Sequence, residues 1–394
     1  MASSGSGVSV LFVDQAGELG GAELSLLDII RTRPGKSEAV LFSDGPFRTR
    51  LEKIGVPTTL MPLGSVGQIG RGSGLMVALK ASPALAGLVF GLARRARGAD
   101  LLYANTQKAF VVAAMAAPFA RRPLIWHLRD MLTADHFAGA MRKVAIGLAN
   151  RNAACIIANS QATADAFRAA GGTAPLRVVH NGIDPAAFDA VPGEAARAAF
   201  RAEIGVPEAP LVGVFSRLAH WKGQHVLVEA MKSLPAIHAV FVGGALFEEA
   251  AYERDLRAQI AAAGLGERCH FLGFRSDVPA LMKSVDIVAH TSIAPEPFGR
   301  VVVEGMLAHR PVVATRAGGV SEIVDDGDTG LLVTPGSVEE LAAALATLVG
   351  SPEAAAALAA RGAEAARRRF SLQACVSGVE AIVHEVVASR RLAA

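Results

Sequence analysis

Cysteine and two of the aromatic residue types are scarce in this sequence of 394 residues, which has 3 Cys, 2 Trp and 2 Tyr. The cysteines are widely separated, and no Cys-x-x-Cys pair indicates a zinc or redox motif. We therefore exclude a disulfide scaffold and expect a reduced, cytoplasmic protein. Residues 1–7 are polar, and residues 8–13 are only long enough for a strand, so no signal peptide is predicted and export is not expected. The three cysteines are Cys155, Cys269 and Cys375.

Long uninterrupted hydrophobic runs are also missing. The most apolar long stretch, residues 75–93, contains Lys80, Ser82 and Pro83, so a membrane-spanning helix is not expected there. We predict a helix over 75–97 with a break at Pro83, because proline removes a helical hydrogen bond and clashes with the preceding turn.

The chain is long, and its charges are unevenly distributed along the sequence. A chain of 394 residues exceeds what one hydrophobic core normally supports, which predicts two domains. The net charge of +3 conceals an asymmetry, because residues 1–180 carry about +9 and the remainder about −6. A basic first half could face anionic lipid or a phosphorylated acceptor, although solvated surface arginines explain it equally well.

The most informative stretch follows an apolar run at 285–289, which predicts a short buried strand. Glu296 and Glu304 then bracket a turn from strand to helix. Pro297 disfavours helix at Glu296, so the helix is expected to begin near Phe298 or Gly299. A helix N-terminus after a strand presents free N–H groups where open α/β sheets bind ligands. Two solvated glutamates near a helix start are the plain alternative.

Four ordered segments strengthen the functional interpretation. The sequence closely resembles the retaining glycosyltransferases of family 4, with their E-x7-E motif, "P-V-V-A-T" strand, "G-G-x-x-E" turn and "D-G-x-T-G-L-L-V" segment. These lie at Glu296 to Glu304, 311–315, 318–322 and 326–333. The resemblance implies that Glu296 and the residues after it hold the donor sugar, and that Glu304 holds the ribose. The implied donor-binding residues of this segment are Glu296, Phe298, Gly299, Arg300, Val301 and Glu304.

A second candidate loop, which carries two cations, follows the predicted strand at 211–215. Arg217 and Lys222 lie on this loop before a helical segment, which is a plausible anion clamp. The resembled family has "R-L-x-x-x-K-G" here, which implies that both cations bind the donor diphosphate. The resemblance also implies a nucleobase contact for Arg275, in a turn where arginine is otherwise ordinary surface chemistry.

The first half offers two further sites. Gly20 and Gly21 follow the predicted strand at 8–13, and their small size lets backbone amides approach a pyrophosphate. In the resembled family a "G-G-A-E" loop stands here and closes on the donor phosphates.

His127 ends another predicted strand, where the family has a histidine close to the reacting sugar. A hydrogen-bonded structural role is the usual one for a lone histidine, and the spacing to Asp130 is longer than in many family members.

The resemblance implies the GT-B fold, with two Rossmann-like, doubly wound parallel-sheet domains facing a cleft. We expect an acceptor-side domain over 1–184, a nucleotide-sugar domain over 185–370, and a helix over 371–394 that crosses back to the first domain. His290, His309 and Arg310 depart from the family pattern, and we interpret them as local packing changes.

The implied activity is transfer of a hexosyl unit from a UDP- or GDP-linked sugar to an acceptor hydroxyl with retention of configuration, in glycan or glycoconjugate biosynthesis. The catalytic residues would be His127, Glu296, Arg217 and Lys222. No metal or other cofactor is predicted, since two fixed cations can stabilise the leaving group. Two alternatives remain open: a sugar-nucleotide hydrolase or epimerase on the same scaffold, and a non-catalytic nucleotide-sugar-binding protein. A nicotinamide oxidoreductase is disfavoured because G-x-G-x-x-G is absent after Val13.

We expect a sugar, a lipid-linked molecule or a small molecule as the acceptor, and no nucleic-acid partner. The apolar stretch 75–92 leads into Arg94, Arg95 and Arg97, a combination that suits peripheral contact with the inner face of a membrane. The same residues would also suit the solvated end of a core helix.

Overall fold

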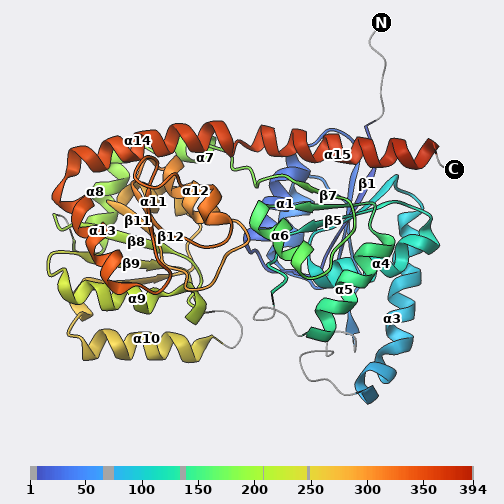
Figure 1. Ribbon diagram of the computed structural model, residues 1–394, viewed down its shortest axis with the longest axis horizontal. Helices are drawn as coiled ribbons and strands as arrows, with labels where there is room; N and C mark the ends of the chain where they lie inside the picture. The colour runs from blue at the N-terminus through green and yellow to red at the C-terminus, as the bar shows by residue number, and fades with distance from the viewer. Residues whose placement is uncertain (1–6, 65–74, 134–138, 207, 246–248, 393–394) are drawn as a thin grey trace, which may run out of the picture. The chain divides into compact units, whose positions relative to one another are not determined.

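The computed structural model describes residues 7–64, 75–133, 139–206, 208–245 and 249–392, with the backbone alone for 75–82. The chain divides into two compact units (Figure 1). The first unit comprises residues 1–182 and 372–394, and the second comprises 183–371. The chain therefore leaves the first unit after Gly182 and returns to it at Leu372.

A parallel sheet of seven strands forms the centre of the first unit, in the order β3-β2-β1-β4-β5-β6-β7. The strand order reverses between β1 and β4, which is where open α/β sheets bind ligands at the carboxyl ends of their strands. The strands are β1 (Val10–Asp14), β2 (Ser37–Leu41), β3 (Thr58–Leu60), β4 (Leu101–Ala104), β5 (Leu124–Leu128), β6 (Cys155–Ala158) and β7 (Leu176–Val178).

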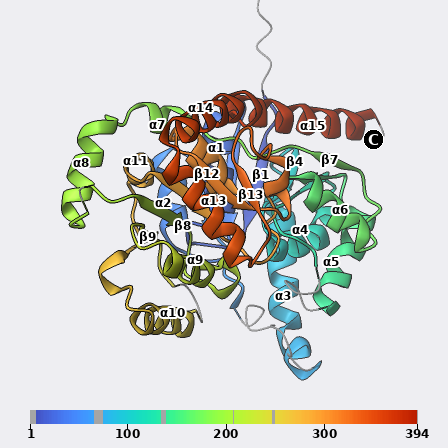
Figure 2. The ribbon, with the colours of Figure 1, turned by 60° about the vertical axis from the view of Figure 1, so that its left-hand side comes forward.

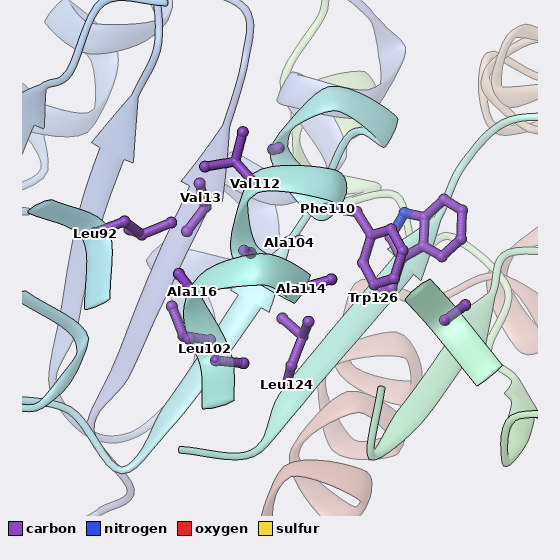
Figure 3. Close-up of a cluster of buried hydrophobic side chains, with 14 of the residues drawn as sticks. Val13, Leu92, Leu102, Ala104, Phe110, Val112, Ala114, Ala116, Leu124 and Trp126 are labelled. Carbon is purple, nitrogen blue, oxygen red and sulfur yellow. The ribbon is translucent and has the colours of Figure 1, made fainter. Parts of the chain in front are cut away.

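Helices cover both faces of this sheet, as expected of parallel strands joined by crossover helices. Most of the small-residue helix α4 is buried, and its Phe110 ring stacks on Trp126 of β5 with 3.9 Å between ring centroids (Figure 3). The helices are α1 (Gly21–Thr32), α2 (Pro46–Lys53), α3 (Leu75–Ala96), α4 (Gln107–Ala120), α5 (Gly139–Asn152), α6 (Gln161–Ala169) and α15 (Leu372–Leu392).

Helix α3 differs from the prediction, because it continues through Pro83 where the sequence suggested a break. A proline costs a helix one hydrogen bond, yet Leu88, Val89 and Leu92 further along α3 are buried in the core. Packing of this later part of the helix outweighs the local cost of the proline.

Helix α15 belongs to the first unit although it follows the second in sequence. Its buried residues, among them Val376, Val379 and Val383, join the same apolar cluster as Phe12 and Leu41 of the sheet.

The second unit is a parallel sheet of six strands in the order β10-β9-β8-β11-β12-β13. Its strand order reverses between β8 and β11. The expected pair of doubly wound parallel sheets is confirmed. The strands are β8 (Leu211–Phe215), β9 (His238–Val242), β10 (Cys269–Gly273), β11 (Ile287–His290), β12 (Val312–Thr315) and β13 (Leu331–Val333).

Helices flank this second sheet (Figure 2), and two apolar clusters lie between the sheet and its helices. Residues of α8, α11 and α12 pack on one face, residues of α9, α10 and α13 pack on the other, and α14 contributes to both. The helices are α7 (Ala186–Asp189), α8 (Gly193–Glu203), α9 (Gln224–Ala230), α10 (Ala250–Ala262), α11 (Val278–Ser284), α12 (Arg300–Leu307), α13 (Val338–Gly350) and α14 (Pro352–Arg369), with short 3₁₀ turns at 220–222, 231–233, 266–268 and 319–322.

Within the described residues, no single helix has both the length and the apolar character needed to cross a bilayer. The bent pair α13 and α14 meets those two criteria when its helices are taken together, with an angle of 105° between them.

Candidate active site

Two loops at the carboxyl ends of β8 and β11 carry three of the predicted site residues of the second unit, Arg217, Lys222 and Glu296. These strands are neighbours at the point where the sheet order reverses, so the loops that follow them leave the sheet side by side. The Thr291 hydroxyl donates to the Lys222 carbonyl over 2.8 Å, and the Ile293 amide donates to the Trp221 carbonyl over 2.8 Å. These bonds join the two loops.

Gly223 makes this joining sterically feasible. Its φ is 69°, and a Cβ atom there would lie 2.0 Å from the Thr291 carbonyl oxygen. Gln224 fixes the same loop from the next helix, because its side-chain amide donates to the Ser216 hydroxyl and the Arg217 carbonyl. A larger residue at 223 would push the two loops apart.

Glu296 lies on the second of these loops and is 8% exposed. Its Oε1 atom accepts hydrogen bonds from Lys222 Nζ over 2.6 Å, His290 Nε2 over 2.8 Å and Ser292 Oγ over 2.5 Å. Among the described residues, no donor reaches Oε2. Burial alone would raise the pKa of Glu296, but Lys222 and His290 outweigh it and hold that pKa well below the usual range. The carboxylate is therefore anionic, with one oxygen held and one available.

The glycine pair Gly318-Gly319 supports Glu296 through the backbone. The Gly319 amide donates to the Glu296 carbonyl over 2.9 Å, and Gly318 adopts a φ of 58°. A Cβ atom on Gly318 would lie 2.2 Å from the Glu296 carbonyl oxygen, and one on Gly319 would lie 2.5 Å from that of Pro297. The "G-G-x-x-E" turn thus fixes the position of Glu296.

Arg217 is half-buried beside the ring of Trp221, with 5.5 Å between its Cζ atom and the ring centroid. Lys222 Nζ lies 4.2 Å from the same centroid. The Arg217 guanidinium also approaches Glu249 at 3.8 Å. The two predicted diphosphate ligands therefore flank one aromatic ring, and this ring limits where the cations can move.

Helix α12 begins at Arg300, one to two residues later than expected. The Phe298 ring is buried and packs at 5.6 Å from the ring of Phe370, so only its backbone is suited to contact a ligand. Arg300 Nε donates to Glu304 Oε1 over 2.7 Å, and both side chains are largely covered. Val301, in the first turn, is half-buried.

Arg275 is placed differently from the other predicted residues. Its guanidinium donates to both carboxylate oxygens of Asp277, at 2.8 and 2.7 Å, and to Glu203 at 3.1 Å. The Arg275 guanidinium is therefore engaged in surface ion pairs with two carboxylates.

In the first unit, Gly20 and Gly21 are exposed at the start of α1. The Gly20 amide donates to Glu23 Oε2 over 2.9 Å, so this N–H is occupied in the structure. Burial, followed by the negative charge of Asp14, raises the pKa of Glu23 to about 7. Glu23 therefore caps the helix start with a carboxyl group that is partly protonated at neutral pH.

His127 is fully buried at the end of β5. Its Nδ1 atom lies 2.5 Å from the Tyr103 hydroxyl and 3.2 Å from Arg129 Nη2. Burial and the charge of Arg129 hold the pKa of His127 well below its usual value, so the ring is neutral. Because a guanidinium can only donate, Nδ1 accepts and the proton lies on Nε2, which has no hydrogen-bond partner in the described structure.

Arg129, which the sequence analysis did not single out, is buried beside His127. Its hydrogen bonds go to four neutral groups in the described part of the chain: Asn105 at 2.5 Å, Ser25 at 2.9 Å, Asn181 at 2.8 Å and His127. Asp130 follows it, and burial and the charge of Asp14 raise the pKa of Asp130 to about 6. A buried cation so close to His127 fixes which ring nitrogen of the histidine carries the proton.

His290, which the sequence led us to interpret as a local packing change, contacts Glu296 directly. The second unit thus brings Lys222 and Glu296 together with His290 and Ser292, and Arg217 lies beside Lys222. Neither His290 nor Arg129 has a motif that would single it out. The only available signal was a polar residue at the carboxyl end of an otherwise apolar strand.

Family models match both halves of the chain. A model described as glycosyl transferases group 1 matches residues 196–366, and one described as a glycosyl transferase 4-like domain matches residues 20–182.

Solved structures match nearly the whole chain. Anabaena Alr3699/HepE in complex with UDP-glucose is 42% identical, with 96% of this chain and 100% of that chain covered and a TM-score of 0.87. The lipopolysaccharide outer core galactosyltransferase WaaB, at 16% identity and a TM-score of 0.71 over 95% of this chain and 99% of that one, shares the fold.

Curated relatives match over shorter stretches. The lipopolysaccharide core biosynthesis mannosyltransferase LpcC of Rhizobium leguminosarum bv. viciae is 32% identical over 55% of this chain and 62% of that protein. The 2-deoxystreptamine glucosyltransferase of Streptomyces kanamyceticus is 31% identical over 57% of this chain and 58% of that protein. The chain thus spans about three fifths of the length of these relatives. With both family models matched and the two parallel sheets of the GT-B fold in place, the chain belongs to the glycosyl transferases group 1 family.

Proposed function

We propose that this protein transfers a hexosyl unit from a UDP-linked sugar to an acceptor hydroxyl, with retention of anomeric configuration. The choice of UDP is supported by the structure of Alr3699/HepE in complex with UDP-glucose, at 42% identity over 96% of this chain. Glucose is therefore the first sugar to test. Relatives named for lipopolysaccharide core biosynthesis favour a saccharide or a glycolipid as acceptor, within glycan biosynthesis.

The observation that carries this proposal is the state of Glu296. Its Oε1 atom is fixed by three donors, while Oε2 has none among the described residues. An anionic oxygen held in a fixed position can accept hydrogen bonds from neighbouring hydroxyls of one sugar ring. We propose that Glu296 orients the donor sugar in this way, and that Glu304 accepts from the ribose.

The diphosphate would be stabilised by the cations on the neighbouring loop. As the bond between the anomeric carbon and the phosphate oxygen breaks, negative charge grows on the diphosphate. Fixed positive groups at that position stabilise the transition state more than the ground state. We propose Arg217 and Lys222 for this role, and we expect turnover without added metal because these residues supply the positive charge.

In a single displacement, retention requires the acceptor oxygen to attack from the face that the phosphate leaves. In the proposed step, the acceptor oxygen bonds to the anomeric carbon as the diphosphate departs, and the acceptor proton passes to the departing phosphate oxygen. The products are the glycosylated acceptor and UDP. His127 would donate from Nε2 to a sugar hydroxyl, and Gly20 and Gly21 remain predicted contacts of the diphosphate.

A panel of UDP- and GDP-sugars, read by thermal shift and then by release of nucleoside diphosphate, tests the proposal. We expect a UDP-sugar to raise the melting temperature and to be turned over faster when a saccharide acceptor is present. Anomeric configuration is read from the product by proton NMR. Transfer to water alone would favour a hydrolase, an epimerised nucleotide sugar would favour an epimerase, and saturable binding without turnover would favour a binding protein.

A further inference from the structure

His290 lies at the end of β11, six residues before Glu296, and is 4% exposed. Its Nε2 atom is 2.8 Å from Glu296 Oε1, and its Nδ1 atom is 3.2 Å from the Thr315 hydroxyl at the end of β12. Because Glu296 is anionic, Nε2 must be the donor in the first contact. His290 therefore connects the carboxylate to the neighbouring strand.

The three donors on Glu296 Oε1 differ in what else they can do. A carboxylate oxygen has about two lone-pair sites, so one of three donors can leave without stripping the atom of its hydrogen bonds. Lys222 has three N–H groups and a flexible stem, and it is the residue proposed to bind the diphosphate. His290 and Ser292 have shorter, less flexible side chains than Lys222 and lie in the same segment as Glu296. Neither is proposed to bind the diphosphate.

We infer that His290 is a positioning residue for donor recognition: it holds Glu296 by Oε1, so that Oε2 faces the sugar when Lys222 moves to the diphosphate. This inference rests on the proposed function, because it assigns the sugar to Glu296 and the phosphates to Lys222. It also assigns a role to a histidine that we first interpreted as a local packing change. His290 itself does not need to touch the sugar.

Three substitutions separate this role from simple packing. In His290→Gln, the side-chain amide can replace Nε2 and still donate to Glu296. In His290→Asn, the shorter amide reaches only the position of Nδ1, near Thr315. His290→Leu fills the space without either hydrogen bond. The matched control is His270→Leu, because His270 lies in the same sheet, on β10, and contacts His238 at 3.3 Å instead of the site.

The measurements are the dissociation constants of UDP and of UDP-glucose by calorimetry, together with the rate of UDP release from UDP-glucose. UDP binding should stay within about twofold of wild type in every variant, because UDP lacks the sugar, and it also shows that each variant is folded. Binding and turnover of UDP-glucose should fall about ten- to a hundredfold in the Leu and Asn variants, as expected for loss of a hydrogen bond to a charged group. The Gln variant should recover most of this loss, and His270→Leu should resemble wild type.

Several outcomes would overturn the inference. These are equal UDP-glucose binding by the Asn and Gln variants, a Leu variant that matches wild type, or a parallel loss of UDP binding. If the Leu variant does not fold, the comparison of Asn with Gln decides. A wild-type protein that binds UDP but not UDP-glucose would contradict the proposed donor as well, whereas normal wild-type turnover with unaffected variants contradicts only the role of His290.

Discussion

Lys222 Nζ lies 2.6 Å from Glu296 Oε1, so the residue proposed to bind the diphosphate is paired with the residue proposed to bind the sugar. Both side chains are largely buried, with 14% and 10% of their surfaces exposed. Removing one partner of a buried pair normally leaves an uncompensated charge. If Lys222 were removed, Glu296 would still accept hydrogen bonds from His290 and Ser292. Glu296 therefore depends less on Lys222 than Lys222 depends on Glu296.

We predict that Lys222→Ala and Arg217→Ala each lower turnover by about two to three orders of magnitude, as for a lost oxyanion-type contact. Folding should survive in both variants, because Glu296 keeps two donors and Arg217 is half-buried on a loop. Steady-state kinetics with the best donor and the melting temperature check the two statements. Lys232→Ala, at an exposed lysine after α9, is the matched control. Near wild-type rates in both loop variants would refute their phosphate role.

A pH dependence of stability is predicted from Glu23. Burial and the charge of Asp14 raise the pKa of Glu23 to about 7, from an ordinary value of 4.5. Between these values the folded protein keeps a proton on Glu23 that the unfolded chain releases, so the contribution of Glu23 to stability is greatest below pH 4.5 and is lost as pH rises through 7. Glu23→Gln keeps an oxygen for the Gly20 amide and removes the charge. We expect it to stabilise the protein by on the order of 1–3 kcal/mol at pH 8, with the difference vanishing near pH 4.5.

Thermal unfolding of the Glu23→Gln variant and of wild type across this pH range measures the effect. The control is Glu18→Gln, at an exposed glutamate of the same loop. Parallel stability curves for wild type and Glu23→Gln would show that Glu23 has the same proton affinity in the folded and unfolded states.

His127 should remain neutral over the physiological pH range. Its ring is buried and faces the Arg129 guanidinium, and both features oppose a positive charge. In nitrogen-15 NMR of the folded protein we expect a protonated Nε2, an unprotonated Nδ1 and no titration between about pH 5.5 and 8. The His127→Gln spectrum assigns the signals. A midpoint near the ordinary value, or a proton on Nδ1, would contradict the proposed donor role of Nε2.

The sequence predicted the fold well, because most β-strands are short runs rich in apolar residues and most of the loops after them contain glycine or proline. It predicted less about individual contacts. Nothing in the local pattern around His290 shows that its ring meets Glu296, since that contact depends on the path of the loop between them. The helix through Pro83 was mispredicted because burial of residues later in α3 is a tertiary effect. The proposed roles of Arg275, Gly20 and Gly21 remain predictions.

Two exposed aromatic rings of the first unit define a surface on which the predicted membrane contact can be tested. Phe90 and Phe119 are 56% and 52% exposed, and their ring centroids are 5.1 Å apart. Arg97 donates to the Phe119 carbonyl, and Arg122 donates to the Arg97 carbonyl, so basic groups lie beside the two rings. Aromatic rings next to arginines suit the boundary of an anionic bilayer, where each cation contributes about 1 kcal/mol. By contrast, Arg95 approaches Glu38 at 3.6 Å, which makes it less suited to lipid contact.

We expect the protein to sediment with anionic vesicles at low salt and less at high salt. Replacing Phe90 and Phe119 by serine should weaken this binding, whereas Phe274→Ser, at an 80% exposed residue of the second unit, should not. Equal, negligible sedimentation with anionic and neutral vesicles would favour a soluble acceptor.

The return of α15 to the first unit affects how the protein is made. Val379 and Val383 of this helix join the apolar cluster that contains Phe12, and Glu380 pairs with the buried Arg33 at 2.8 Å. The ribosome must add all of 183–371 before this helix appears, which takes roughly 10 to 40 s at ordinary synthesis rates. During that interval the apolar residues that α15 covers are exposed, and Arg33 lacks its carboxylate partner. A chain that stops after Ser371 would keep every proposed catalytic residue and still be a target for chaperones and proteases.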